Sequence, residues 1–292
     1  MRRPRSRPRT RKRKQKRQTR KRQRGGDEAN VFHFWNQFHY GDNILNLKFL
    51  YNISEILKEK GISIKYYYDT NYNSNKVELE RYLHPNGVVT LNPLDQRPGN
   101  SIGMWMGDPI GGVNYLTFDK LYKLLYSKIM NILGIPPEGI NTSLYQPAPY
   151  LEDIYQKLND KFKDLDILII NGKSNSLVMT LDKPTFNKET MDSMCDRLSK
   201  KYKIATTTCV NDSISCTMRD GLTLQDIGAI STHAKYIIGV HTGPLTACFT
   251  EATKNSVKKW IIFTNDGTTF EDINAMVVND TYDLNTIEKD IN

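Results

Sequence analysis

The residues best suited to chemistry are His241, Thr242, Gly243, Pro244 and Leu245, which follow a short apolar run and open an apolar pattern of helical spacing. A helix start offers unpaired backbone N–H groups and about half a positive charge, which together suit a phosphate. Glycine lets a ligand approach the backbone, and proline fits the first helical turn. The segment therefore predicts a nucleotide-type ligand. The alternative is an ordinary strand-to-helix turn.

A second polar turn, Tyr40-Gly41-Asp42-Asn43, follows the apolar run 31–35. Asp42 is a candidate general base, because a carboxylate at a strand end can accept a proton from a substrate hydroxyl. Its alternative role is the N-cap of the helix that follows. His39, Tyr40 and Asn43, beside Asp42, are candidates for acceptor binding.

A third polar turn, Asn171-Gly172-Lys173-Ser174, follows the apolar run 166–170. Lys173 and Ser174 are candidates for contact with phosphate oxygens, and the alternative for Lys173 is a solvated loop lysine. The long segment 92–114 contains Met104 and Trp105, which either stack on an acceptor sugar or anchor the loop. Glu251 either accepts a hydrogen bond from a ribose hydroxyl or lies on the surface.

Alternating strands and helices must position these turns. Apolar spacing predicts the first half as strands 31–35, 62–68 and 88–91 and helices 44–57 and 118–133. It predicts the second half as helices 151–162, 188–202, 224–234 and 244–253 and strands 166–170, 203–209, 236–240 and 260–264. The fold class is therefore α/β, with two Rossmann-like domains of parallel strands, 27–150 and 151–292, facing a cleft. Ligands in such folds lie beyond the carboxyl ends of the strands, where all three polar turns are expected.

The chain of 292 residues has a formal net charge of +9, but its basic residues are unevenly placed. Residues 1–24 hold 15 Lys and Arg and no acid, and the remainder holds 26 basic and 32 acidic residues. Residues 1–26 lack an apolar residue after Met1, so we expect a disordered tail that contacts nucleic acid or another anionic surface. The mildly acidic remainder does not favour a domain that itself grips a polyanion.

No run approaches the length of a membrane span, and the basic tail lacks the apolar centre of a secretory signal. The four cysteines form no CxxC pair, and no histidine stands at metal-ligand spacing, so no metal site or cofactor is expected. We expect reduced, mostly buried thiols in a soluble intracellular protein, although Cys209 and Cys216 could pair across a hairpin.

Two segments resemble one family. The segment 222–247, LTLQDIGAISTHAKYIIGVHTGPLTA, resembles the C-terminal signature of the heptosyltransferase-like family (ADP-heptose:LPS heptosyltransferase type) of inverting glycosyltransferases. The segment 38–50, FHYGDNILNLKFL, resembles its N-terminal strand, "GD" turn and helix. Together they cover about forty residues. The tail ending in Gly-Gly also resembles tails on proteins of large DNA viruses, which would make the protein cytoplasmic or virion-associated.

The resemblance implies a GT-B architecture and metal-independent transfer of a sugar, with inversion, from a nucleotide-sugar to a glycan or glycoprotein acceptor. It implies Asp42 as the base, Thr242 and Gly243 on the diphosphate, and Lys173 as a neutralising charge. The sequence departs from the family at His241, where the family has an acid, and at Thr246, where it has histidine. Two alternatives stay open: an inactive nucleotide- or glycan-binding module, and a nucleic-acid-associated protein that acts through its tail.

Overall fold

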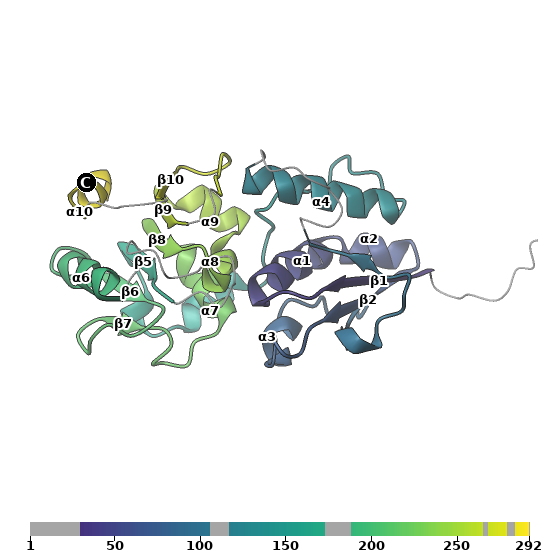
Figure 1. The fold of residues 1–292 in the computed structure, drawn as a ribbon, viewed down its shortest axis with the longest axis horizontal. Coiled ribbons are helices and arrows are strands. Elements are labelled where there is room, and N and C mark those ends of the chain that lie inside the picture. Colours follow the sequence, from purple (N-terminus) through teal and green to yellow (C-terminus); the bar gives the residue numbers. More distant parts are fainter. Residues whose placement is uncertain (1–29, 106–116, 173–187, 265–267, 279–283, 292) are drawn as a thin grey trace, which may run out of the picture.

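A computed structural model describes residues 30–105, 117–172, 188–264, 268–278 and 284–291. Two separate parallel sheets, one of four strands and one of six, form two halves that lie end to end (Figure 1). The predicted α/β class with two Rossmann-like halves is therefore confirmed. The boundary at residue 150 and the basic tail, which lies outside the described residues, stay predictions.

The N-terminal sheet has the strand order β3-β2-β1-β4. Its strands are β1 (Asn30–Asn36), β2 (Ile62–Tyr68), β3 (Val89–Pro93) and β4 (Ile102–Gly103). The helices of this half are α1 (Tyr40–Asn52), α2 (Ser54–Glu59), α3 (Lys76–Glu80) and α4 (Phe118–Ile132), with a 3-10 turn at Leu94–Gln96. Helix α4 packs over α1, since the rings of Phe49 and Tyr126 stack 4.1 Å apart and the Tyr126 hydroxyl donates to Leu45 O.

The C-terminal sheet has the order β10-β9-β8-β5-β6-β7. Its strands are β5 (Ile167–Ile170), β6 (Ile204–Thr206), β7 (Ser215–Cys216), β8 (Tyr236–Val240), β9 (Lys259–Phe263) and β10 (Ala275–Val278). The helices of this half are α5 (Leu151–Lys157), α6 (Lys188–Ser199), α7 (Leu224–Ser231), α8 (Gly243–Cys248), α9 (Glu251–Ser256) and α10 (Leu284–Ile291), with a 3-10 turn at Asp160–Phe162.

Both faces of the C-terminal sheet are buried, which explains its continuous apolar strands. Ile167 and Ile169 pack with helix α6 in one cluster, whereas Leu168 and Ile170 belong to the other. That second cluster also contains N-terminal residues such as Phe49. One apolar core therefore runs through both halves, and burial of this core contributes to holding them together.

The sequence predicted the long strands well and several boundaries poorly. Strands 62–68 and 236–240 are confirmed as β2 and β8. The predicted helix 44–57 is two helices that break at Ile53, and the predicted helix 244–253 is α8 and α9, separated at Phe249. The short strands β4, β7 and β10 and helices α3 and α10 were not predicted.

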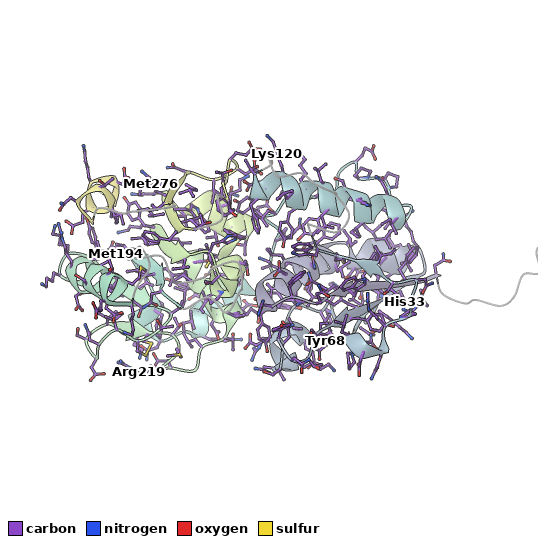
Figure 2. All side chains as sticks on the ribbon, in the orientation of Figure 1. His33, Tyr68, Lys120, Met194, Arg219 and Met276 are labelled. Carbon is purple, nitrogen blue, oxygen red and sulfur yellow. A yellow bond between two sulfur atoms is a disulfide. The ribbon has the colours of Figure 1, made fainter. Side chains whose placement is uncertain are left out.

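The two halves also meet through polar contacts at the start of α4. Phe118 N donates to Thr269 O at 2.9 Å, and Glu271 N donates to the Asp119 carboxylate at 2.8 Å. Lys120 pairs with Glu271 at 3.0 Å, and Figure 2 shows Lys120 at the junction of the halves. A helix whose remainder packs on α1 therefore contacts the C-terminal half through its first turn.

The expectation of reduced thiols is wrong for two of the four cysteines, whereas the alternative that Cys209 pairs with Cys216 is confirmed. Cys209 and Cys216 form a disulfide, whereas Cys195 and Cys248 are free and buried. The proposed hairpin is also wrong, because β6 and β7 are parallel neighbours and the bridge closes the connection between them. In the described part of the chain, no helix combines the length and apolarity needed to cross a bilayer.

Candidate functional site

The strand orders place the segments with the described site residues at the switch point of each sheet. In the N-terminal sheet the order reverses between β1 and β4, so the switch point lies between the segment after β1 and Met104-Trp105 after β4. In the C-terminal sheet it reverses between β5 and β8, so the switch point lies between the segments beginning at Asn171 and His241. Open α/β sheets bind ligands at such switch points.

Buried amides fix the backbone that leads into α1. The Asn36 side chain accepts from Phe38 N at 2.8 Å, and Asn73 donates to Phe38 O at 2.8 Å. Asn43 donates to both Phe38 O and His39 O and accepts from the Tyr66 hydroxyl. Asn43 is fully buried and supports the turn, and its predicted contact with the acceptor stays a prediction.

Asp42 lies in the first turn of α1, and the N-cap of this helix is His39. The alternative role of Asp42 as an N-cap is therefore wrong. The residue as a whole is partly buried, and its carboxylate accepts from the Tyr122 hydroxyl at 3.5 Å. Burial raises the pKa of Asp42 from 3.8 to about 6, against smaller opposing effects of a backbone hydrogen bond and Tyr122. A carboxylate with this pKa is ionised at neutral pH and has increased basicity, as a general base requires.

The predicted phosphate turn opens α8. Thr242 is the N-cap residue, with its hydroxyl donating to Val240 O, and Gly243 and Pro244 begin the helix. The side chain of Leu245 is fully buried, so only its backbone could meet a ligand. The first N–H groups of any helix lack partners inside it, which keeps this segment suitable for an anion.

The starts of α1 and α8 touch each other across the junction of the halves (Figure 1). A Cβ atom added to Gly41 would lie 2.9 Å from Thr246 Oγ1 and 3.1 Å from Gly243 Cα. The absence of a side chain at Gly41 is thus what allows this approach. Asp42 therefore lies one residue from a direct contact with the predicted phosphate turn.

Replacing Gly41 with alanine should separate the two helix starts by a few tenths of an ångström. Because the obstacle includes backbone of Gly243, we expect a loss of stability of roughly 1–3 kcal/mol and weaker donor binding. The matched control is Gly99→Ala, where an added Cβ meets nothing within 4 Å. Denaturant unfolding of both variants checks this, and equal stabilities would contradict the contact.

The ring of His241 packs among three phenylalanines. Phe118 lies edge-on at 4.8 Å between ring centroids, Phe270 at 5.7 Å and Phe249 at 6.3 Å. Phe118 belongs to α4 of the N-terminal half, so His241 helps to join the halves. Its predicted contact with the donor stays a prediction.

The predicted acceptor residues follow β1 and β4. His39 lies 4.7 Å from the Tyr72 ring, and Trp105 lies 4.7 Å from Phe38. The Tyr40 hydroxyl accepts from Asn75 N at 2.6 Å. Met104 is buried, and its carbonyl accepts from Asn36 and Asn46, so its predicted contact with an acceptor is wrong.

Lys173 and Ser174 lie outside the described residues, but the turn that leads to them is well defined. Asn171 N donates to the Thr207 hydroxyl, and the Asn171 side chain donates to Thr208 O and accepts from Thr208 N. Cys209, which follows Thr208, is held by the disulfide with Cys216. Among the described residues, no group of three or more His, Cys, Asp or Glu could hold a metal.

Lys48 is a site-supporting residue that sequence reasoning missed. It lies on α1 and is fully buried, and its ammonium donates to Thr246 O at 3.1 Å and Phe249 O at 2.7 Å. These carbonyls are at the end of α8, so one side chain ties the helix of Asp42 to the helix of Gly243. The sequence signal was a lysine on the otherwise apolar face of the helix.

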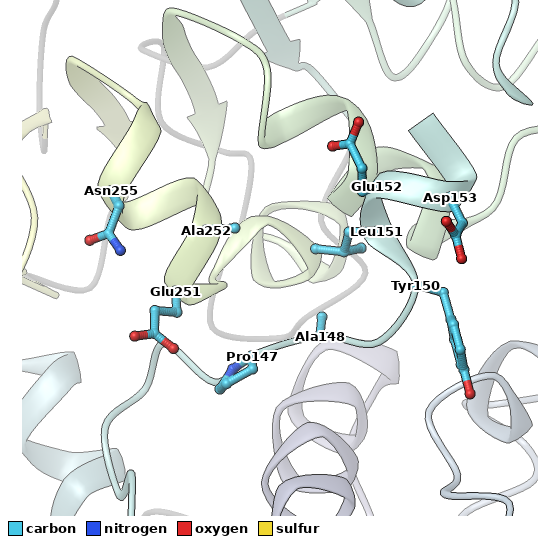
Figure 3. A pocket seen from close by; sticks show the side chains of 9 residues that line it. All are labelled: Pro147, Ala148, Tyr150, Leu151, Glu152, Asp153, Glu251, Ala252 and Asn255. Carbon is cyan, nitrogen blue, oxygen red and sulfur yellow. The ribbon is translucent and has the colours of Figure 1, made fainter. Parts of the chain in front are cut away.

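An open cavity of about 580 Å³ lies elsewhere, between the segment 147–153 and α9. Figure 3 shows Tyr150, Glu152, Asp153 and Glu251 around it. Asn52, at the far end of α1 from Asp42, contacts Gln146 and Pro147 beside this region. Glu251 lines this cavity, and its predicted hydrogen bond to a ribose stays a prediction.

Comparison with known proteins gives matches in structure. No protein-family model matches the chain, and no curated protein matches it by sequence. The heptosyltransferase WaaC of E. coli, solved with ADP-2-deoxy-2-fluoro heptose, is similar with a TM-score of 0.50 and 10% identity, over 89% of this chain and 98% of that one. A glycosyl transferase of family 9 from Veillonella parvula has a TM-score of 0.48 and 12% identity, over 89% and 88%. None of these matches bears on the viral resemblance of the tail.

The predicted resemblance is thus confirmed at the level of the fold. Two parallel sheets, contacting helix starts and a match that spans nearly the whole of both chains agree with one another. The chain has the two-domain GT-B fold of the heptosyltransferase-type glycosyltransferases.

Proposed function

We propose that the protein is an inverting, metal-independent glycosyltransferase that moves a sugar from a nucleotide-sugar to a saccharide acceptor. The observation that carries the proposal is the contact between the start of α1, with Asp42, and the start of α8, with Gly243. A base and an anion-binding turn side by side are what this reaction needs, because a proton leaves the nucleophile as negative charge develops on the leaving group.

In the proposed reaction Asp42 accepts the proton of an acceptor hydroxyl while that oxygen attacks the anomeric carbon. The bond between the anomeric carbon and the diphosphate breaks, and the diphosphate leaves with the electron pair. Backbone N–H groups at the start of α8 stabilise the charge, and the carboxylate is kept in place by Tyr122. Thr242, Gly243 and Lys173 are the proposed diphosphate contacts, with His241 and Ser174 beside them.

The nature of the donor is supported by the similar fold of WaaC, which was solved with an ADP-linked sugar analogue. A thermal-shift screen with UDP-, GDP-, ADP- and CMP-sugars tests this proposal. A donor present at a hundred times its Kd should stabilise the protein by about 2.7 kcal/mol, which raises Tm by several degrees. No shift with any nucleotide-sugar would contradict a donor site.

The pH dependence of transfer should report Asp42. Because burial raises the pKa of Asp42 to about 6, kcat/KM should be constant near pH 7–8 and fall about tenfold per pH unit below about 6. The base is inactive when protonated, so activity is lost as the pH falls. Initial rates between pH 4.5 and 8 check this prediction. An uncharged sugar is used as the acceptor, so that ionisation of the acceptor does not contribute to the pH dependence. An acid limb near pH 4 would show that Asp42 is not the desolvated base.

Thr246 favours a second candidate function, an inactive nucleotide- or glycan-binding module. Its hydroxyl donates to Gly243 O at 2.6 Å, so the side chain that replaces the family histidine is engaged within α8. Binding of a nucleotide-sugar without transfer to any acceptor would favour this module. Contact of the basic tail with nucleic acid is proposed separately and is tested by deleting residues 1–26, which should abolish polyanion binding and leave sugar chemistry intact.

A further inference from the structure

We propose that the acceptor is a near-neutral saccharide whose sugar rings stack on an aromatic platform formed by Phe38, His39, Tyr72 and Trp105. This inference rests on the proposed transferase function and deepens it. It names the class of acceptor and the side chains that select it, none of which is given by the fold alone. Two ring pairs at the start of α1, the helix that carries Asp42, support it.

The first pair stands at the switch point of the N-terminal sheet. Phe38 follows β1 and Trp105 follows β4, and their ring centroids are 4.7 Å apart. Both side chains are only half-buried. Since the crevice between the reversing strands is where such sheets bind ligands, these rings are placed where a ligand would lie.

The second pair lies at the start of the helix that carries Asp42. His39 is the N-cap of α1, and Asp42 is three residues later, in the first turn. The His39 ring lies 4.7 Å from the ring of Tyr72, which is 51% exposed. A sugar that contacts this pair would therefore lie at the same end of α1 as Asp42.

The backbone beneath the platform is rigid, whereas the rings themselves remain accessible. Asn36, Asn43 and Asn73 together hold the Phe38 and His39 peptide groups by hydrogen bonds of 2.8–3.0 Å. Buried amides that fix exposed rings cost stability unless they are satisfied, and here they are. Aromatic rings held in this way suit the apolar C–H faces of sugars and lose little entropy on binding.

The charges of the described segments at this edge disfavour an anionic ligand. The segments after the four strands, 37–39, 69–75, 94–101 and 104–105, contain only Asp69, Asp95 and Arg97 as charged residues. Arg97 lies over the Trp35 ring at 4.1 Å. With Asp42 beside them, these described segments carry a net negative charge, so an acceptor rich in phosphate or carboxylate groups would be repelled.

Tryptophan fluorescence offers a direct test with the full chain. Two of the three tryptophans, Trp35 and Trp105, lie at this edge, and Trp260 is fully buried. Cellohexaose, maltohexaose and chitohexaose serve as neutral probes, and the hyaluronan hexasaccharide serves as the anionic probe. We expect at least one neutral probe to change the emission and the hyaluronan probe to bind more weakly.

Substitutions then assign the binding to the platform. Tyr72→Ala and Phe38→Ala should each weaken binding of the neutral probe about two- to tenfold, and Tyr72→Phe should restore it. Trp105→Phe should keep the binding, followed by calorimetry, and lose most of the fluorescence change. Leu124→Ala, an exposed apolar residue of α4, is the control and should bind normally. Circular dichroism confirms that each variant folds.

The outcomes distinguish a failure of the aromatic platform from a failure of the proposed transferase function. Preference for hyaluronan, no binding of any neutral probe, or unchanged binding in both Tyr72→Ala and Phe38→Ala would overturn the platform and leave transfer standing. Neutral-probe binding that Tyr72→Ala weakens, with no transfer from any nucleotide-sugar, would instead overturn the transferase and leave the platform as a saccharide-binding surface. A higher KM for a neutral acceptor in Tyr72→Ala, with kcat unchanged, supports both.

Discussion

Asp42→Asn should lower the rate of sugar transfer by about 10²–10⁴ and leave nucleotide-sugar binding unchanged. Asparagine has the same shape and keeps an oxygen for the Tyr122 hydroxyl, but it cannot take the proton of an acceptor hydroxyl. The loss should therefore fall on kcat, with little change in the KM for donor. Single-turnover rates and a donor thermal shift measure the two quantities separately.

The same substitution should raise stability, which distinguishes a lost base from a damaged fold. Ionised Asp42 is disfavoured by burial, so its pKa in the folded protein, about 6, exceeds its ordinary value of 3.8. The contribution of Asp42 to the free energy of unfolding is therefore greatest below pH 3.8. It falls by about 3 kcal/mol at most as the pH rises from 3.8 through about 6. Asparagine removes this cost, so Tm at pH 7 should rise.

The matched control is Glu59→Gln, an exposed acid at the end of α2, outside the segments proposed to contact a ligand. It should change neither the rate nor Tm, because its carboxylate is solvated. Full transfer activity in Asp42→Asn would remove the base from the proposed mechanism. Loss of activity together with a lower Tm would assign Asp42 a structural role instead.

The sequence predicted those elements of the fold that carry their own local signal. β2 and β8 are apolar runs bounded by polar or glycine residues, and both bounds were correct. Strands of two residues such as β4 and β7 are too short to show a period and exist only through pairing with a neighbour. The break between α8 and α9 at Phe249 interrupts a continuous apolar spacing with neither glycine nor proline, so no local residue marks it.

The sequence indicated those parts of the candidate site that have a local motif, and it did not indicate the parts that depend on tertiary contacts. The polar turns at Asp42 and Thr242 follow strand ends, and their meeting at the junction was expected from the order of α/β folds. The start of α1 at Tyr40 was not predicted, because its N-cap residue, His39, makes no side-chain hydrogen bond to the helix. Lys48 acts through a partner 201 residues away along the chain, and Tyr122 acts through one 80 residues away. No pattern within one segment can indicate such contacts.

The stability of the protein relative to its Lys48→Met variant should rise by about 3 kcal/mol between pH 7 and pH 9.5. Burial lowers the pKa of Lys48 from 10.5 to about 7. In that range the unfolded chain holds a proton on Lys48 that the folded chain has largely lost, so stability rises with pH. Methionine fills similar space and has no proton to lose, so the variant lacks this rise. Urea unfolding of both proteins across the range measures the difference.

The stability of Lys48→Met must be compared with that of the original protein at two pH values. At pH 7 the cost of burying a partly charged amine offsets the hydrogen bonds to Thr246 O and Phe249 O, so Lys48→Met should be about as stable as the original. At pH 9.5 the neutral amine still donates to both carbonyls and the cost has gone, so the variant should be the weaker protein. The exposed Lys58→Met is the control and should follow the original chain. Parallel stability curves for Lys48→Met and the original would mean that Lys48 is solvated, and hence that α1 and α8 do not meet as the proposed transfer requires.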